Sequence, residues 1–237
     1  MQNIISLFLV FMLFITPSNS EIEKASKTTE TKKIVYLTFD DAPGGKVTKD
    51  MLKTLKDNNV NATFFLIGEQ IDNNQQEIIK QMVSDGNAVG LHSYTHDHCK
   101  LYGPNGDFFK EMAECQNSIK NACGVTTNIL RFPFGCNSSY FKLTKSMLNK
   151  IHSKNLKVYE WNVDSTDGLY PKLSPSKIAK RAQSTKKTAV VLMHSGYNNK
   201  NSAAALNEVI QYYKKNGYTF KTISDDTEEL YRIIKKK

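Results

Sequence analysis

Short apolar runs alternate with longer segments of helical spacing along most of the chain. The apolar, β-branched-rich runs predict seven strands, at Ile34–Phe39, Val60–Ile67, Ala88–Leu91, Ile129–Phe132, Val158–Trp161, Ala189–Met193 and Tyr218–Ile223. The segments between them predict helices over 47–58, 73–84, 107–122, 142–153, 175–184 and 202–215, with a last one near 226–234. Such alternation indicates a parallel sheet covered by helices. About seven units favour a closed or nearly closed α/β barrel, and an open doubly wound sheet is the alternative.

The first twenty residues carry no charged side chain and contain an apolar stretch from Ile4 to Ile15, followed by small residues at Ser18 and Ser20. This pattern is typical of a secretory signal peptide, residues 1–20, although an uncleaved anchor is the alternative. Residues 21–33 read as a solvated linker, which leaves one folded domain at 34–237. We therefore expect a secreted protein of the extracellular space or cell wall, without stable membrane insertion after cleavage.

Composition adds two expectations. All four cysteines lie between Cys99 and Cys136, and in an oxidising compartment they could form two disulfides. A helix over 107–122 would hold Cys115 and Cys123 about 12 Å apart. This distance excludes a Cys115–Cys123 disulfide. The possible pairings are then 99–115 with 123–136, or 99–123 with 115–136, and unpaired buried thiols are the alternative. The net charge of +9 is scattered, which suits a solvated surface or attraction to an anionic wall polymer rather than nucleic-acid binding. We expect a monomer.

Polar residues follow five of the predicted strands. They are Asp40 and Asp41, then His92 and His96, then Arg131, then Asp164 and Asp167, and finally His194. In α/β folds the carboxyl ends of parallel strands lie on one face, where ligands bind. These side chains are therefore expected to meet at a single site.

The residue types in this set indicate metal-assisted hydrolysis. His92 and His96 are four residues apart, so on a helical turn both rings could hold one metal, with an aspartate as third ligand. Two histidines and one carboxylate leave positions open for water, and the second aspartate can then act as a base. His194 is a candidate acid, and a buried Arg131 would orient a carboxylate. A mononuclear iron oxygenase also uses two histidines and a carboxylate, but it needs neither a paired base nor a late histidine.

Five motifs appear in the order "TFDDAP", "HSYTH", "RFPFG", "DSTD" and "LMH", and "VNATFFLIG" lies between the first two. With these motifs the chain resembles the polysaccharide deacetylases that share the NodB homology domain, carbohydrate esterase family 4. The resemblance extends from about Ile34 to Ile223 and implies a distorted (β/α) barrel.

The resemblance also implies roles for individual residues. Asp40 is similar to the family's catalytic base, and Arg131 to the arginine that positions it. Asp41, His92 and His96 resemble the metal ligands, for Zn²⁺ or another divalent ion such as Co²⁺. His194 resembles the acid and Asp167 the residue that tethers it. The resemblance further implies a substrate-binding set: Phe134, whose backbone N–H would help hold the oxyanion, Leu192 and Trp161.

The implied reaction removes N-acetyl groups from N-acetylglucosamine residues of a cell-wall polysaccharide, chitin or peptidoglycan, and acetylated xylan is a further substrate of relatives. The fourth motif of the family usually ends in Asp-Trp, whereas Gly168 follows Asp167 here. A catalytically degenerate, secreted carbohydrate-binding wall protein of the same fold is therefore the alternative function.

Overall fold

The domain is built on one curved parallel sheet. The structure is a computed structural model that describes residues 32–233. Its strands are β1 (Lys33–Ala42), β2 (Thr63–Leu66), β3 (Ala88–Leu91), β4 (Ile129–Leu130), β5 (Lys157–Val158), β6 (Val163–Asp164), β7 (Thr188–His194) and β8 (Tyr218–Phe220). They lie in the order β5-β4-β3-β2-β1-β7-β6, with β8 paired to the first residues of β1. All strand pairs in this sheet are parallel.

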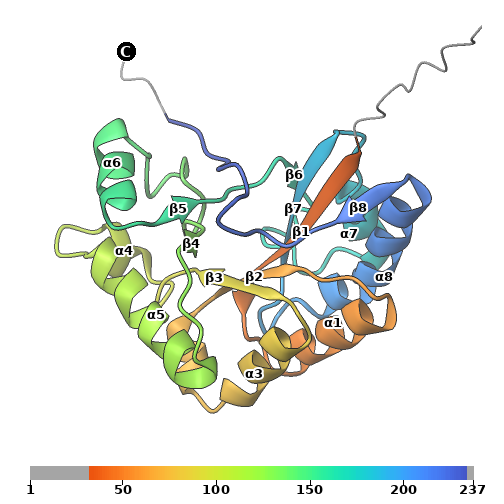
Figure 1. The fold of residues 1–237 in the computed structure, drawn as a ribbon, viewed down its shortest axis with the longest axis horizontal. Coiled ribbons are helices and arrows are strands. Elements are labelled where there is room, and N and C mark those ends of the chain that lie inside the picture. Colours follow the sequence, from red (N-terminus) through yellow and green to blue (C-terminus); the bar gives the residue numbers. More distant parts are fainter. Residues whose placement is uncertain (1–31, 234–237) are drawn as a thin grey trace, which may run out of the picture. The chain divides into compact units, whose positions relative to one another are not determined.

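Helices cover the outer face of the sheet. They are α1 (Lys46–Asp57), α2 (Gly68–Asp72), α3 (Gln76–Ser84), α4 (His98–Tyr102), α5 (Phe108–Cys123), α6 (Lys145–Ser153), α7 (Pro175–Arg181) and α8 (Lys200–Lys215). In Figure 1, α5, α3, α1 and α8 follow one another in an arc around the strands. Among residues 32–233, no helix is both long enough and apolar enough to cross a membrane. The expected signal peptide, and the linker up to Thr31, lie outside the described residues.

Burial on both faces explains why the apolar runs form strands. Residues 35–40 of β1 are all buried, as a central parallel strand between two layers requires. Against β1 and β2 pack helices with one apolar face, such as α1, which buries Val47, Met51 and Leu55. Helix α5 begins at an Asp107 cap, whose side chain accepts the Lys110 N–H, and ends at Gly124 with a φ of 76°. The predicted distorted barrel is confirmed.

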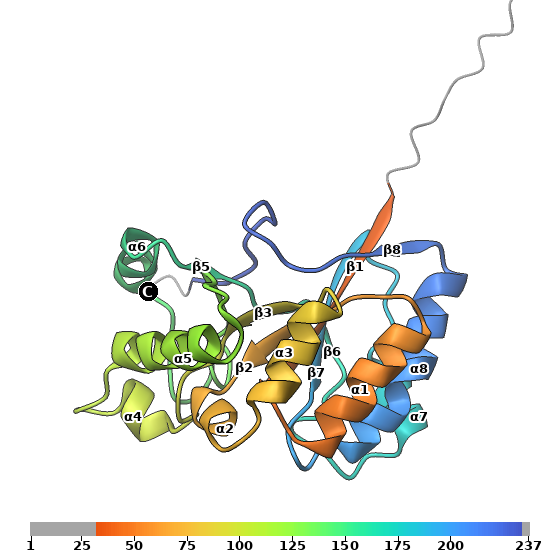
Figure 2. The same cartoon turned by 60° about the horizontal axis from the view of Figure 1, so that its bottom comes forward.

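The barrel is open at one seam, which the sequence pattern did not reveal. The expected strand Val158–Trp161 is shorter, and the chain then crosses from β5 at one end of the strand order to β6 at the other. Residues 159–162 therefore span the two edges of the sheet. The segment after β8 runs back over the strands to this crossing (Figure 2), where Leu230 pairs with Tyr159.

The helix predicted near 226–234 is not formed within the part that the structure describes. Leu230 exchanges backbone hydrogen bonds with the crossing: its N–H donates to Val158 O, and its carbonyl accepts from Glu160 N. The Tyr159 hydroxyl donates to the carbonyl oxygens of Ser224 and Thr227. These tertiary contacts take up the backbone groups that a helix would have used, and so outweigh the local helical spacing.

The predicted disulfides are not formed, because all four cysteines are free thiols in this structure. Cys115 is buried on the inner face of α5 and donates to Leu66 O, whereas Cys123 at the end of α5 donates to Ile119 O. Cys99 is exposed, and Cys136 is buried against Arg232 O. Each thiol is thus used as a small side chain in a different environment, which corresponds to the unpaired alternative.

Replacing Leu37 with alanine tests the central position of β1. Leu37 is completely buried, so we expect the free energy of unfolding to fall by about 3 kcal/mol. The same substitution at Leu169, which is 76% exposed, should change it by less than about 0.5 kcal/mol. Urea unfolding of both variants measures the two changes in the free energy of unfolding. Equal decreases would show that Leu37 does not lie in the core.

Candidate active site

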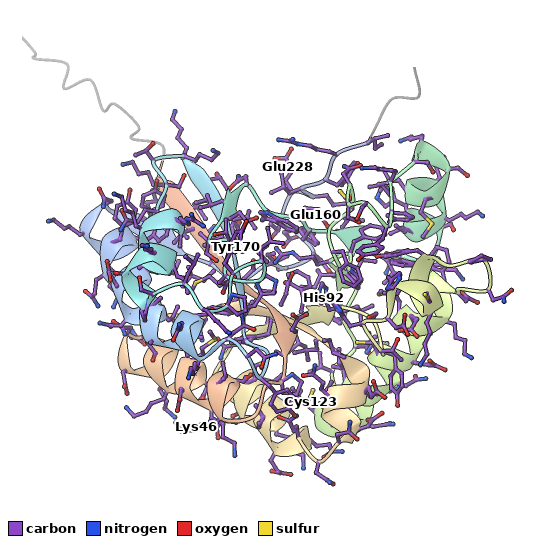
Figure 3. All side chains as sticks on the ribbon, turned by 180° about the vertical axis from the view of Figure 1, so that it is seen from behind. Lys46, His92, Cys123, Glu160, Tyr170 and Glu228 are labelled. Carbon is purple, nitrogen blue, oxygen red and sulfur yellow. The ribbon has the colours of Figure 1, made fainter. Side chains whose placement is uncertain are left out.

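The polar strand ends meet in one pocket of about 420 Å³. Nine of the eleven residues expected at the site line it: Asp40, Asp41, His92, His96, Phe134, Trp161, Asp164, Leu192 and His194. Arg131 and Asp167 are completely buried behind the pocket wall, in contact with Asp40 and His194 respectively. In Figure 3, His92 lies toward the middle of the fold, whereas Lys46 on α1 lies at its margin. A larger cavity of about 810 Å³ lies at the other ends of β3 and β4 and contains none of these residues.

Asp40 is held by a buried arginine. Arg131 Nη1 donates to Asp40 Oδ1 at 2.9 Å and to Thr38 Oγ1 at 2.7 Å. Its other nitrogens donate to the carbonyl oxygens of Tyr159 and Glu160. Burial alone would raise the pKa of Asp40, but the Arg131 guanidinium and nearby histidines hold it below its usual value. Asp40 is therefore an ionised carboxylate at neutral pH, with one oxygen, Oδ2, 3.7 Å from His92 Nε2.

Asp41, His92 and His96 form a set of converging ligand atoms. Asp41 Oδ1 lies 3.5 Å from His92 Nε2 and 3.4 Å from His96 Nε2. This oxygen is buried and has no hydrogen-bond partner among the described residues. His92 Nδ1 lies 3.0 Å from Arg131 O, so its N–H donates there and the Nε2 lone pair faces Asp41.

The protonation states of the two histidines suit a cation. Burial lowers the pKa of both His92 and His96, so both imidazoles are neutral at neutral pH and can act as ligands. An unpaired, buried carboxylate oxygen beside two neutral imidazoles is a donor set that fits a divalent metal ion. A second set of ligand-type side chains, Asp97, His98 and Cys99, follows in sequence, but all three are exposed.

The loop that carries the two histidines is not the helical turn expected from their spacing. Ser93 and His96 have φ values of 77° and 58°, in the left-handed region. Glu111, buried on α5, accepts hydrogen bonds from the N–H groups of Tyr94 and Thr95 and from the Thr95 hydroxyl. Sequence reasoning missed Glu111. The available signal was a carboxylate on the buried stripe of an otherwise amphipathic helix.

His194 and Asp167 form the second ion pair at the pocket. Its Nδ1 lies 2.7 Å from Asp167 Oδ1, and its backbone N–H donates to Asp167 Oδ2 at 2.8 Å. Burial would lower the pKa of His194, but the hydrogen bond and charge of Asp167 raise it to about 9. His194 is therefore protonated at neutral pH, with Nε2 directed away from Asp167.

Because Gly168 has no side chain, the His194 ring can occupy the space beside it. A Cβ atom built on Gly168 would lie 2.4 Å from His194 Cε1 and 2.6 Å from Nε2. Both distances are shorter than any real contact, so a side chain here would displace the ring. The glycine thus accompanies an intact His194–Asp167 pair rather than a broken one.

The remaining expected residues form the rim and floor of the pocket. Phe134 is 39% exposed, has a φ of 64°, and packs against the His96 ring with centroids 4.6 Å apart. Leu192 is buried and Trp161 is half-buried. An apolar rim around a polar floor is typical of a pocket for a small organic group.

Comparison with known proteins shows the family of this chain. Residues 27–154 match the family model described as "Polysaccharide deacetylase". A peptidoglycan-N-acetylglucosamine deacetylase of Bacillus cereus is 36% identical over 202 residues, which cover 83% of this chain and 71% of that protein. Peptidoglycan-N-acetylglucosamine deacetylase PgdA of Listeria monocytogenes is 30% identical over 217 residues, covering 91% of this chain and 42% of that protein.

Solved structures show the same fold. The polysaccharide deacetylase Bc1974 of Bacillus cereus superposes with a TM-score of 0.75 at 35% identity, covering 83% of this chain and 95% of that chain. The catalytic domain of a peptidoglycan N-acetylglucosamine deacetylase of Eubacterium rectale gives a TM-score of 0.77 at 28% identity, with 86% and 94% covered. This chain therefore belongs to the polysaccharide deacetylase family.

Proposed function

We propose that this protein is a secreted, metal-dependent hydrolase that removes N-acetyl groups from N-acetylglucosamine residues of peptidoglycan. One observation carries the proposal: a pocket with three convergent metal-type ligands holds an ionised carboxylate, Asp40, and a protonated imidazole, His194. A base and an acid kept in opposite protonation states are what amide hydrolysis needs. Peptidoglycan is preferred over chitin because similar proteins are named as peptidoglycan deacetylases.

Asp41, His92 and His96 would hold the metal, for which zinc is the first choice and cobalt the second. When bound, a divalent cation polarises a carbonyl oxygen and lowers the pKa of water. The chain's own residues set its position: Arg131 O fixes the His92 tautomer, and Glu111 fixes the loop that presents His96.

Proton transfer is assigned to the two paired side chains. Asp40 accepts a proton from the attacking water, and Arg131 keeps its carboxylate ionised and aligned. His194 donates its Nε2 proton to the nitrogen that leaves as the amine, and Asp167 keeps the imidazole charged until then. The backbone N–H of Phe134 is the candidate donor to the carbonyl oxygen of the acetamide.

Replacing Asp40 with asparagine tests the base. Asparagine can still accept the Arg131 hydrogen bond but cannot take a proton, so we expect acetate release from peptidoglycan to fall at least about a hundred-fold. Unchanged release would contradict the assignment. A wild-type protein that binds the polymer but releases no acetate would support the carbohydrate-binding alternative instead.

The pH dependence tests the acid. His194 must be protonated to donate, and because its pKa lies near 9 we expect acetate release to decline as pH rises through about 9. The Asp167→Asn variant loses the charge that raises this pKa, so its alkaline decline should begin at lower pH. Identical pH–rate profiles for the wild type and Asp167→Asn would show that His194 is not the proton donor.

Metal content tests the ligand set independently of activity. We expect one equivalent of zinc in the loaded wild-type protein and almost none in His96→Ala, because two ligands hold zinc much more weakly than three. His152→Ala, a change at an exposed residue of α6, is the matched control and should keep the full equivalent. Elemental analysis after dialysis measures the bound zinc. A full equivalent of zinc in His96→Ala would show that Asp41, His92 and His96 are not the metal ligands.

A further inference from the structure

The fold gathers lysines at one end of the sheet, where β1 begins between β7 and β8 (Figure 1). The Ile34 N–H donates to Lys187 O at 2.8 Å on one side, and Lys33 pairs with Tyr218 of β8 on the other. The segments that meet here, 32–35, 183–188 and 211–222, contain no aspartate or glutamate. We refer to their lysines, all of them exposed, as the lysine end: Lys32, Lys33, Lys186, Lys187, Lys214, Lys215 and Lys221.

The charge of the lysine end is not balanced by carboxylates. Within residues 32–233, none of its ammonium groups forms an ion pair. Lysines on the helices differ: Lys46, Lys53 and Lys80 each pair with a carboxylate three or four positions away. Lys214 donates to the Asn58 carbonyl and Lys33 lies over the Tyr218 ring, but neither contact cancels a charge. Charges that are scattered along the sequence thus become a concentrated positive patch in the fold.

The lysine end lies opposite the catalytic pocket. Asp40 and His194 stand at the far ends of β1 and β7, where they pair in register. From Lys33 to Asp40 the chain rises by about 23 Å along β1. None of the lysines lines the pocket. A partner held by the lysine end therefore leaves the pocket open.

The residue type indicates attraction to a broad anionic surface. All cations of the lysine end are lysines, which act as compact, hydrated point charges. Arginine is the residue that clamps a single phosphate with two parallel hydrogen bonds. The lysines also spread across the first residues of β1, the segments beside it and the end of α8, instead of converging on one point. Near a bilayer with anionic headgroups each such lysine adds a similar favourable increment without a shaped cavity.

The connectivity of the chain favours a bilayer over a soluble polymer. The chain enters the domain at Lys32, within the lysine end, and the residues before it include the apolar stretch from Ile4 to Ile15. A basic cluster that follows an apolar segment is typical of proteins attracted to anionic lipid headgroups. The end of the domain that comes first after the apolar stretch is therefore the end whose charge suits headgroups.

We propose that the lysine end docks this protein on the surface of a bilayer that exposes anionic phospholipid headgroups, with the catalytic pocket directed away from the lipid. The attraction is electrostatic and needs no inserted segment, so it persists after signal cleavage. It does not rest on the proposed function, because it uses the amino ends of the strands and the reaction uses their carboxyl ends.

Vesicle co-sedimentation tests the docking. The mature form, residues 21–237, retains the whole described domain. It is mixed at about 0.1 M salt with vesicles of phosphatidylglycerol and phosphatidylcholine in equal parts, or of phosphatidylcholine alone. We expect binding to the anionic vesicles only. At about 1 M salt, where the Debye length falls to about 3 Å, this binding should disappear.

A fourfold variant assigns the binding to the lysine end. It combines changes at residues whose side chains make no hydrogen bond or ion pair within the described part of the chain: Lys186→Gln, Lys187→Gln, Lys215→Gln and Lys221→Gln. Each lysine contributes about fivefold at an anionic bilayer, so we expect vesicle binding to fall at least about tenfold.

The matched control removes the same charge from exposed residues of α1, α4, α6 and α7: Lys49→Gln, Lys100→Gln, Lys145→Gln and Lys177→Gln. These residues lie outside the lysine end, and the attraction fades within a Debye length of the bilayer. We therefore expect the control to lose less than about twofold in vesicle binding.

Three outcomes would overturn the docking. They are unchanged vesicle binding by the lysine-end variant, equal losses in the variant and the control, and binding of soluble polyphosphate without any binding of anionic vesicles. Acetate release from soluble N-acetylglucosamine oligomers should be equal in all three proteins, because no changed residue lines the pocket. If the wild type releases no acetate, the proposed function fails, and the vesicle measurement still decides the docking.

Discussion

The burial of Arg131 is the constraint on which the site depends. A guanidinium with no exposure must satisfy its donors within the protein, and Arg131 does so with Asp40, Thr38 and the carbonyls of the β5–β6 crossing. These acceptors come from the first strand and from the segment that spans the open barrel. The Arg131 side chain therefore ties the Asp40 carboxylate to the seam of the fold, and the Arg131 carbonyl orients the His92 ring.

The pocket maintains two ionised groups of opposite sign by the same means. Burial disfavours both the carboxylate of Asp40 and the imidazolium of His194, and in each case a hydrogen-bonded partner of opposite charge contributes most to reversing that effect. The partners, Arg131 and Asp167, are completely buried and do not line the pocket. Asp40 and His194 can thus face the pocket while the groups that set their charge stay out of water and in fixed positions.

The convergence of the strand ends was predictable, because alternating elements force a parallel sheet and a parallel sheet gathers Asp40, His92 and His194 at one edge. The conformation of the loop that carries His92 and His96 was not predictable from the sequence. The left-handed φ of His96 depends on Glu111, which lies on a different element and has no local signature near the motif. The crossing to β6 and the non-helical segment around Leu230 likewise depend on contacts between residues some 70 apart. Local spacing carries no information about such partners.

Gly168 makes two positions of the chain interdependent. The His194 ring lies where a side chain on residue 168 would begin, so the identity of one residue limits the placement of the other. An aromatic residue introduced here alone would collide with the His194 ring instead of adding a pocket wall. Exchange of this motif with a relative that carries a larger residue therefore requires compensating changes around His194. Position 168 and the placement of His194 are thus coupled, so the glycine by itself does not indicate that the His194–Asp167 pair is lost.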